Sequence, residues 1–183
     1  MPFAKPKKRD PVGEPELFNY AVSTLARRPR TVRDLRRLLK LRAEPGDPGE
    51  AAINRVLARL TDLRYLSDEQ FAADYTRLRK DGQSLGQRRV RQDLAAKGIA
   101  KDLAATTLAN AYSDTDEVAL AQQFCTRKRI QPPTTEKETA RTLGRLLRAG
   151  FSSTSIWKLL RSWKVEINEE TDLEPADADD SAT

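Results

Sequence analysis

The sequence has 183 residues, of which 38% are hydrophobic, 6% are aromatic and 33% are charged, a composition that is thin for one large globular core. It contains no histidine and a single cysteine, which excludes an internal disulfide, histidine-containing zinc sites and the usual catalytic triads. Residues 166–183 carry eight acids and no base, whereas residues 17–165 carry a surplus of 13 positive charges. That surplus favours a polyanionic partner such as nucleic acid, with a solvated surface as the alternative.

Nothing in the sequence indicates a membrane protein or a secreted one. No apolar run approaches the length of a membrane span, and the first ten residues, MPFAKPKKRD, contain no hydrophobic signal segment. A lone cysteine suits a reducing compartment. We therefore expect a cytoplasmic protein without membrane contacts.

The two ends of the chain differ in character from its body. Residues 1–16 combine four prolines with charged side chains and predict a flexible arm, and the acidic residues 166–183 predict a disordered tail because they cannot bury enough apolar surface. Between them the apolar residues recur at helical spacing, and no stretch shows the period-two alternation of a strand. The first clear helix start is Thr31, which precedes Leu35, Leu38 and Leu39.

Capping patterns predict further helix starts along the body. Ser67 and Gln70 have the spacing of a capping box, and Leu66 and Phe71 occupy the positions of a hydrophobic staple. Thr135 and Glu138 repeat the capping-box spacing after a pair of prolines.

Two other helices are expected between these points. Ser84 predicts the start of a helix with Val90 and Leu94 on its apolar face, closed by Gly98 in a left-handed conformation. Acids at 114–117 and bases at 127–129 predict the two ends of a following helix, since this is the order that the helix dipole favours.

The segments 90–108 and 142–160 are similar at an offset of 52 residues. Both read as helix, glycine, apolar residue, short polar turn and helix, and the matching pairs are Leu94 with Leu146, Gly98 with Gly150, Ile99 with Phe151, and Leu108 with Leu160. A weaker third copy covers residues 35–60. Repeats of about 50 residues that each bury little surface alone predict a quasi-linear array.

Three segments resemble the RecX family: LARRPRTVRDLRRLL (25–39), YLSDEQFAADYTRLRKDGQSLGQRRVRQDLAAKGI (65–99) and TLGRLLRAGFSSTSIWKLLR (142–161). The resemblance implies an all-α fold, an elongated curved array of three tandem three-helix repeats, here at 17–66, 67–113 and 114–165. Two departures from the family pattern are the long acidic loop LKLRAEPGDPGE in the first repeat and Arg64, which stands where a glycine often precedes Tyr-Leu.

The same resemblance implies a non-enzymatic regulatory protein in DNA repair, homologous recombination and the SOS response. Such a protein binds the filament of the RecA recombinase on single-stranded DNA, contacts single- and double-stranded DNA backbone, and inhibits the recombinase's ATPase, strand exchange and coprotease activity. It implies a monomer without a cofactor or metal.

Basic residues recur on single faces of the predicted helices and are the candidate contacts to nucleic acid or protein partners, with a solvated face as the alternative reading of each. They are Arg33, Arg36, Arg37 and Lys40; Arg88, Arg89, Arg91 and Lys97; Arg141, Arg145 and Arg148; and Lys158 and Arg161. Trp157 and Trp163 could stack on bases but are expected in the core, and Cys125 is expected to be a buried small hydrophobe.

Two other functions stay open on the sequence. A helix-turn-helix-like DNA-binding regulator that acts without RecA would share the basic helices. A nuclease with a carboxylate-bound metal would need a cluster of Asp and Glu at metal-binding spacing, and no such cluster stands out.

Overall fold

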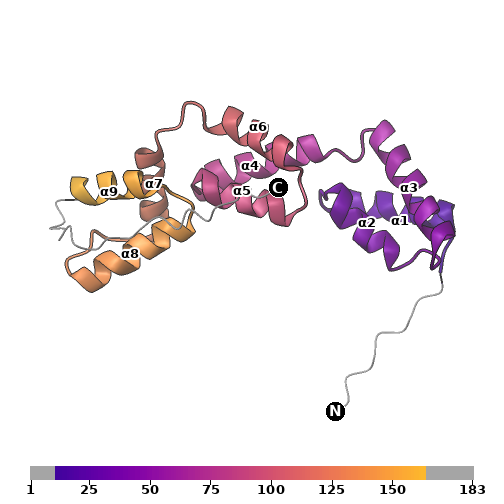
Figure 1. Cartoon of the computed structure of the whole chain (residues 1–183), viewed down its shortest axis with the longest axis horizontal. Helices are drawn as coiled ribbons and strands as arrows, with labels where there is room; N and C mark the ends of the chain where they lie inside the picture. Colours follow the sequence, from indigo (N-terminus) through magenta and orange to yellow (C-terminus); the bar gives the residue numbers. More distant parts are fainter. Residues whose placement is uncertain (1–10, 164–183) are drawn as a thin grey trace, which may run out of the picture.

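The computed structural model describes residues 11–163, and within this range it contains nine α-helices and no strand. The helices form a row of three-helix units, coloured indigo to yellow in Figure 1. Their bounds are α1 Glu14–Arg27, α2 Val32–Lys40, α3 Asp47–Asp62, α4 Asp68–Gln83, α5 Gln87–Ala96, α6 Lys101–Tyr112, α7 Glu117–Lys128, α8 Glu136–Arg148 and α9 Ser153–Ser162. The expected all-α array of tandem three-helix repeats is confirmed.

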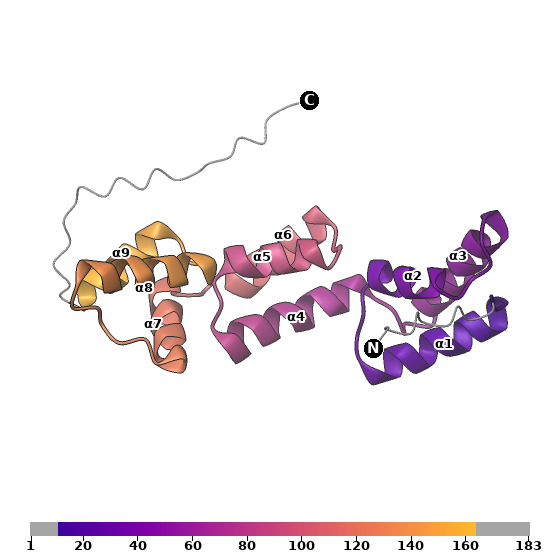
Figure 2. The same ribbon diagram turned by 90° about the horizontal axis from the view of Figure 1, so that it is seen from below.

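Each unit has its own hydrophobic core, which is why the molecule is elongated in both views (Figures 1 and 2). The first core lies between α1, α2 and α3 around Leu17, Leu35 and Ile53. The second includes Val90 and Leu108. Because Leu66 packs in the first core and Ser67 caps the next helix, we propose that the first repeat ends at residue 66; the second would end at residue 113.

Several helix starts lie where the capping chemistry places them. The hydroxyls of Thr31, Ser67 and Thr135 accept hydrogen bonds from the N–H groups three residues later, and the Asp116 carboxylate caps α7. The second half of the capping box at Ser67 is absent from the described residues, because the Gln70 side chain donates to Asp74. The Glu138 carboxylate accepts chiefly from the Thr134 N–H and hydroxyl, and a hydrogen bond from the Thr135 backbone also lowers the pKa of its carboxyl, so the second capping box is closed in part.

The hydrophobic staple and one helix start were wrong. Leu66 belongs to the first core, whereas Phe71 packs against the second, so the two residues serve different repeats. Ser84 does not open a helix: it ends α4 in a left-handed conformation with φ of 52°, and α5 begins only after Gly86. The sequence alone does not separate a serine that ends one helix from a serine that begins the next, because both lie between two helical segments.

The glycine turns of the second and third repeats are equivalent, as the 52-residue offset predicts. Gly98 and Gly150 both have positive φ, 80° and 92°. The apolar residues after them, Ile99 and Phe151, are buried. The sequence repeat therefore corresponds to a repeated turn in three dimensions.

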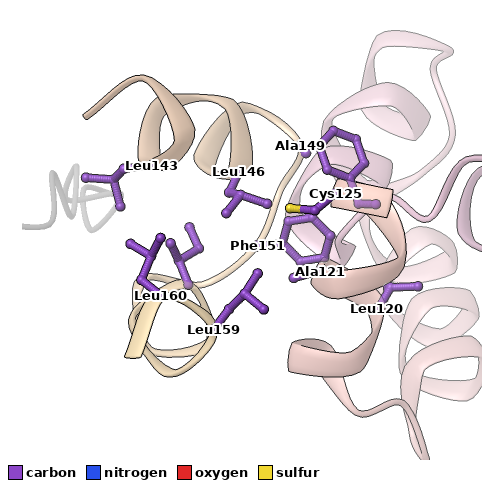
Figure 3. Packing of buried hydrophobic residues seen from close by; sticks show 11 residues of the cluster. Leu120, Ala121, Cys125, Leu143, Leu146, Ala149, Phe151, Leu159 and Leu160 are labelled. Carbon is purple, nitrogen blue, oxygen red and sulfur yellow. The ribbon is translucent and has the colours of Figure 1, made fainter. Parts of the chain in front are cut away.

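The third core is built around aromatic and aliphatic side chains from α7, α8 and α9 (Figure 3). The rings of Phe124 and Phe151 meet edge to face at 5.8 Å between centroids. Cys125 is 1% exposed in this core, and burial raises the pKa of its thiol to about 11. Trp157 and Trp163 pack against the same core, as expected. Cysteine and tryptophans are thus structural here.

The predicted flexible arm, residues 1–16, extends too far along the chain. Helix α1 begins at Glu14 with Pro15 in its first turn, a position where the missing N–H costs nothing. Residues 14–16 are therefore helical, because a proline near the start of a helix favours the helix instead of breaking it. Residues 1–10 and the acidic tail at 166–183 lie outside the described residues.

The two junctions between repeats use the same arrangement. In each, the N-terminal end of the second helix of one repeat meets the glycine turn of the next repeat. At the first junction the Thr31 hydroxyl donates to the Lys97 carbonyl at 2.9 Å, and the Arg33 guanidinium donates to the carbonyl of Ala96. At the second, the Gly86 N–H donates to the Ala149 carbonyl at 2.9 Å.

Candidate nucleic-acid interface

A cleft between the second and third repeats collects arginines from both. It has a volume of about 290 Å³, and we call it the arginine cleft. Its walls come from α4 and α5 on one side and from α7 and α8 on the other. The lining residues are Arg79, Gln83, Leu85, Arg89, Asp93, Phe124, Arg145, Arg148 and Ala149. Three of the arginines, Arg89, Arg145 and Arg148, belong to the basic faces found in the sequence.

Close backbone contact at the second junction creates this cleft. The Arg88 N–H donates to the Gly150 carbonyl at 3.3 Å, next to the contact between Gly86 and Ala149. A Cβ built on Gly86 would lie 2.3 Å from the Gly150 oxygen, and one built on Gly150 would lie 2.3 Å from the Arg89 nitrogen. Only glycines allow α5 to start this close to the end of α8, and this closeness places Arg89 and Arg148 on one cleft.

A single carboxylate holds two of the four guanidinium groups in place. The Asp93 carboxylate is 3.3 Å from Arg79 Nε and 3.1 Å from Arg89 Nε, and the Tyr75 hydroxyl donates to it at 3.2 Å. Arg79 also donates to the Tyr75 oxygen and lies over the Tyr75 ring.

The remaining two arginines give the cleft its charge. Arg145 and Arg148 are exposed and form no ion pair within residues 11–163. With four guanidinium groups against one carboxylate, the arginine cleft has an excess positive charge and presents fork-shaped donors, which suit phosphate oxygens.

A second basic hollow of about 280 Å³ adjoins the cleft along α8. It is lined by Arg129, Arg141 and Arg145, so Arg145 belongs to both hollows. Glu138 is the acid here; hydrogen bonds from the Thr134 N–H and hydroxyl lower the pKa of its carboxyl. The two hollows together form a basic track over α8.

The basic face of α2 is a different case, because internal contacts occupy most of it. Arg36 donates to Asn54 at 2.6 Å, and Lys40 forms an ion pair with Glu50 at 2.6 Å. Partners from α3 and from the next repeat thus lie on the face of the predicted basic stripe, whose role in binding stays a prediction. Arg33 is likewise used at the first junction, and Lys97 forms an ion pair with Asp34 at 3.8 Å. Arg33, Arg37 and Lys40 are all exposed, and Arg37 forms no ion pair within residues 11–163.

The other predicted residues lie outside the arginine cleft. Arg88 and Arg91 are exposed on α5, and the charge of Arg88 contributes to lowering the pKa of Glu117. Lys158 and Arg161 are exposed on α9. None of the four lines either hollow of the track.

Sequence reasoning missed Arg79 and Arg129, which line the two hollows. Neither belongs to a basic face within its own helix, which was the signal that the sequence search used. Arg79 lines a cleft between two repeats, and neighbours in different repeats have no fixed spacing in the sequence. Arg129 is the C-cap of α7 and lines its hollow with α8 of the same repeat.

Comparison with known proteins places this architecture in a family. A family model described as "RecX, second three-helix domain" matches residues 67–108, from the cap of α4 into α6. The regulatory protein RecX of Mycobacterium ulcerans is 30% identical over 154 residues, which cover 83% of this chain and 87% of that protein. The chain belongs to the RecX family.

Other RecX proteins agree with this assignment. RecX of Myxococcus xanthus is 32% identical over 161 residues, covering 80% of this chain and 85% of that protein. The crystal structure of RecX from Lactobacillus salivarius is similar in fold, with a TM-score of 0.62 at 23% identity over 82% of this chain and 96% of that one.

Two further findings concern other kinds of site. Among residues 11–163, no helix is both long and apolar enough to cross a membrane. In the same part of the chain, no group of three or more His, Cys, Asp and Glu side chains could hold a metal ion. The RecX proteins that match are named regulatory proteins, in keeping with a regulatory role for this member of the family.

Proposed function

We propose that this RecX-family chain regulates the RecA recombinase by binding its filament on DNA and inhibiting ATP hydrolysis and strand exchange. The observation that carries the DNA part is the arginine cleft, which joins basic residues of two repeats and continues along α8. Family membership supports the recombinase part. An elongated row of repeats also suits a helical filament, because successive units can meet successive subunits.

Phosphate contact in the cleft has a measurable signature. Each neutralised phosphate releases counterions, so the affinity for single-stranded DNA falls with salt with a slope of about −0.7 per contact on a log–log plot. Changing Arg145 and Arg148 together to Ala should therefore flatten the slope by about 1.4. Changing Arg37 and Lys158 to Ala removes the same charge outside the cleft and serves as the control, with a smaller effect expected.

Filament binding is tested on RecA already assembled on single-stranded DNA, with excess DNA added as a trap. A filament-binding regulator still suppresses ATP hydrolysis under these conditions, whereas a protein that merely competes for free DNA is removed by the trap. If the preformed filament is unaffected while bare DNA is bound well, the chain is a DNA-binding regulator that acts independently of RecA.

A further inference from the structure

A third hollow lies at the first junction, and its chemistry differs from that of the arginine cleft. It has a volume of about 420 Å³ and runs between the α1–α2 loop and the outer face of α4. We call it the junction groove. Its lining residues are Arg28, Pro29, Arg30, Asp34, Phe71, Asp74, Tyr75, Leu78 and Lys97.

The floor of the junction groove is apolar and uncovered. The rings of Phe71 and Tyr75 stack with centroids 5.7 Å apart, and Leu78 one turn further along is 61% exposed. The first and second cores do not reach across this junction, since no residue belongs to both of them. An aliphatic side chain next to an aromatic pair therefore faces solvent in a hollow, where a partner's apolar group would displace water.

The charges around the groove leave a place for one anion. Asp34 forms an ion pair with Lys97, and Asp74 accepts from Gln70 and lies 3.4 Å from an Arg77 nitrogen.

Arg28 and Arg30 form no ion pair with the described residues, and Arg30 Nε is buried without a hydrogen-bond partner there. A buried unpaired donor costs free energy until an acceptor reaches it.

We propose that the junction groove binds a polypeptide segment of the recombinase that carries an aliphatic side chain next to a carboxylate. The aliphatic group would contact Leu78 and the aromatic pair, and the carboxylate would accept from Arg30. This assignment rests on the proposed function. It divides the array into a protein-binding groove at the first junction and a phosphate-binding cleft at the second.

Nucleic acid fits the junction groove less well. Asp34 and Asp74 would face its phosphates, and the Tyr75 ring already stacks on Phe71 and carries the Arg79 guanidinium, so it offers little surface to a base. A polypeptide that carries both an apolar and a charged side chain matches the apolar floor and the rim of acidic and basic residues together.

The experiment compares two exposed leucines in the full-length protein. Leu78→Asp introduces a carboxylate on the groove floor, and Leu41→Asp introduces the same charge at a leucine that is 74% exposed and does not line the groove. Each variant is assayed for inhibition of ATP hydrolysis by preformed RecA filaments with trap DNA, and for affinity to bare single-stranded DNA.

We expect Leu78→Asp to raise the half-inhibitory concentration about tenfold or more, as for a central apolar anchor, with DNA affinity unchanged within about twofold. Leu41→Asp and the conservative Leu78→Met should behave like the wild type in both assays. Circular dichroism of each variant checks that the fold is intact.

Each contrary result has its own meaning. If Leu78→Asp inhibits as well as the wild type does, the groove is not the docking site. If it weakens binding to bare DNA as much as it weakens inhibition, the groove binds nucleic acid and the polypeptide assignment is wrong. If the wild type leaves preformed filaments active, the proposed function fails, and the recombinase is not the occupant.

Discussion

The two junctions between repeats share a design and differ in what makes the contact. At the first, side chains reach across: the Thr31 hydroxyl and the Arg33 guanidinium bind carbonyls at the end of α5. At the second, the backbone itself makes the contact, and Leu85 and Tyr112 pack against both adjoining cores. A side chain can release its contact by changing rotamer, whereas a backbone contact can be released only by moving a whole helix. We therefore expect the first junction to be the weaker coupling in the row, and the larger of the two junction hollows lies there.

The largest expected effect comes from the two equivalent glycines. Gly150→Ala should lower the free energy of unfolding by about 3 kcal/mol or more, because its Cβ would meet the Arg89 backbone 2.3 Å away at a positive φ. Gly98→Ala should cost about 1–2 kcal/mol, the left-handed conformation itself, because its Cβ would meet only the movable side chain of Arg33.

Urea titration with two probes measures this difference. Both tryptophans of the chain, Trp157 and Trp163, lie in the third repeat, so fluorescence reports that unit and circular dichroism reports all helices. Gly144→Ala, within α8 and near only the flexible Arg148 side chain, is the control and should stabilise by about 0.5–1 kcal/mol. Equal losses for the two turn glycines would contradict the proposed difference between the junctions.

A smaller effect is expected from acid, with opposite signs in two places. At the first junction, the Asp68 carboxylate accepts from the Val32 N–H at 2.9 Å. The pKa of Asp68 is raised chiefly by burial and further by the negative charges of Glu69 and Asp34. The hydrogen bond from Val32 acts in the opposite direction but does not outweigh them. Because the folded pKa lies above the unfolded value of 3.8, the ionised Asp68 destabilises the fold at neutral pH. This destabilisation disappears as pH falls through the folded pKa and the carboxyl becomes protonated.

Glu117 in the third repeat responds in the other direction. Burial tends to raise the pKa of this carboxyl, but hydrogen bonds from Ser152 and Ser155 and the charge of Arg88 lower it overall. Its stabilising contribution is therefore present above the unfolded pKa of 4.5 and is lost as pH falls through the lower folded pKa.

Urea midpoints across this acid range test both signs. Glu117→Gln should be destabilised at pH 7, and its difference from the wild type should shrink as pH falls below 4.5. Asp68→Asn keeps an oxygen for the Val32 N–H, so it should be at least as stable as the wild type at neutral pH and lose that advantage in acid. Parallel pH profiles for the two variants would be the contrary outcome.

The features of the fold that could be predicted from the sequence are those that depend on residues close together in the chain. Caps at Thr31, Ser67 and Thr135, and the left-handed glycines, were predicted because their chemistry lies within four residues. The three-repeat fold followed from the internal similarity and the family resemblance.

The candidate site was predicted only in part, because a helical face shows where a side chain leaves its helix and not what it meets. Arg36 and Lys40 have the spacing of a binding face, yet Asn54 and Glu50 from another helix satisfy them. Arg79 lines the arginine cleft together with residues of the third repeat, although its own partners lie in the second. Periodicity within one helix carries no information about either event.

The smallest effect is expected at Arg64, between α3 and α4. This residue has φ of 58°, a conformation that favours glycine, and the family pattern often has glycine there. Arg64→Gly should stabilise the chain by about 0.5 kcal/mol, after the entropy that glycine loses is set against the relief of the left-handed strain. Thermal unfolding of the two proteins side by side is sufficient; a lower midpoint for the glycine variant would contradict this reading.

The repeated docking of helix starts on glycine turns gives the array a direction. The first and second repeats each offer the start of their second helix to the turn of the next, and within residues 11–163 the turn of the first repeat receives no such helix start. The Arg42 carbonyl of that turn instead accepts from the Val12 N–H, just before α1. A turn with no docking partner is free to lengthen. The expected acidic loop of the first repeat is shorter than predicted, because Asp47 to Glu50 already form the first turn of α3. What is left, residues 41–46, is still longer than the equivalent turns 97–100 and 149–152, which fits a turn that no helix start has to meet.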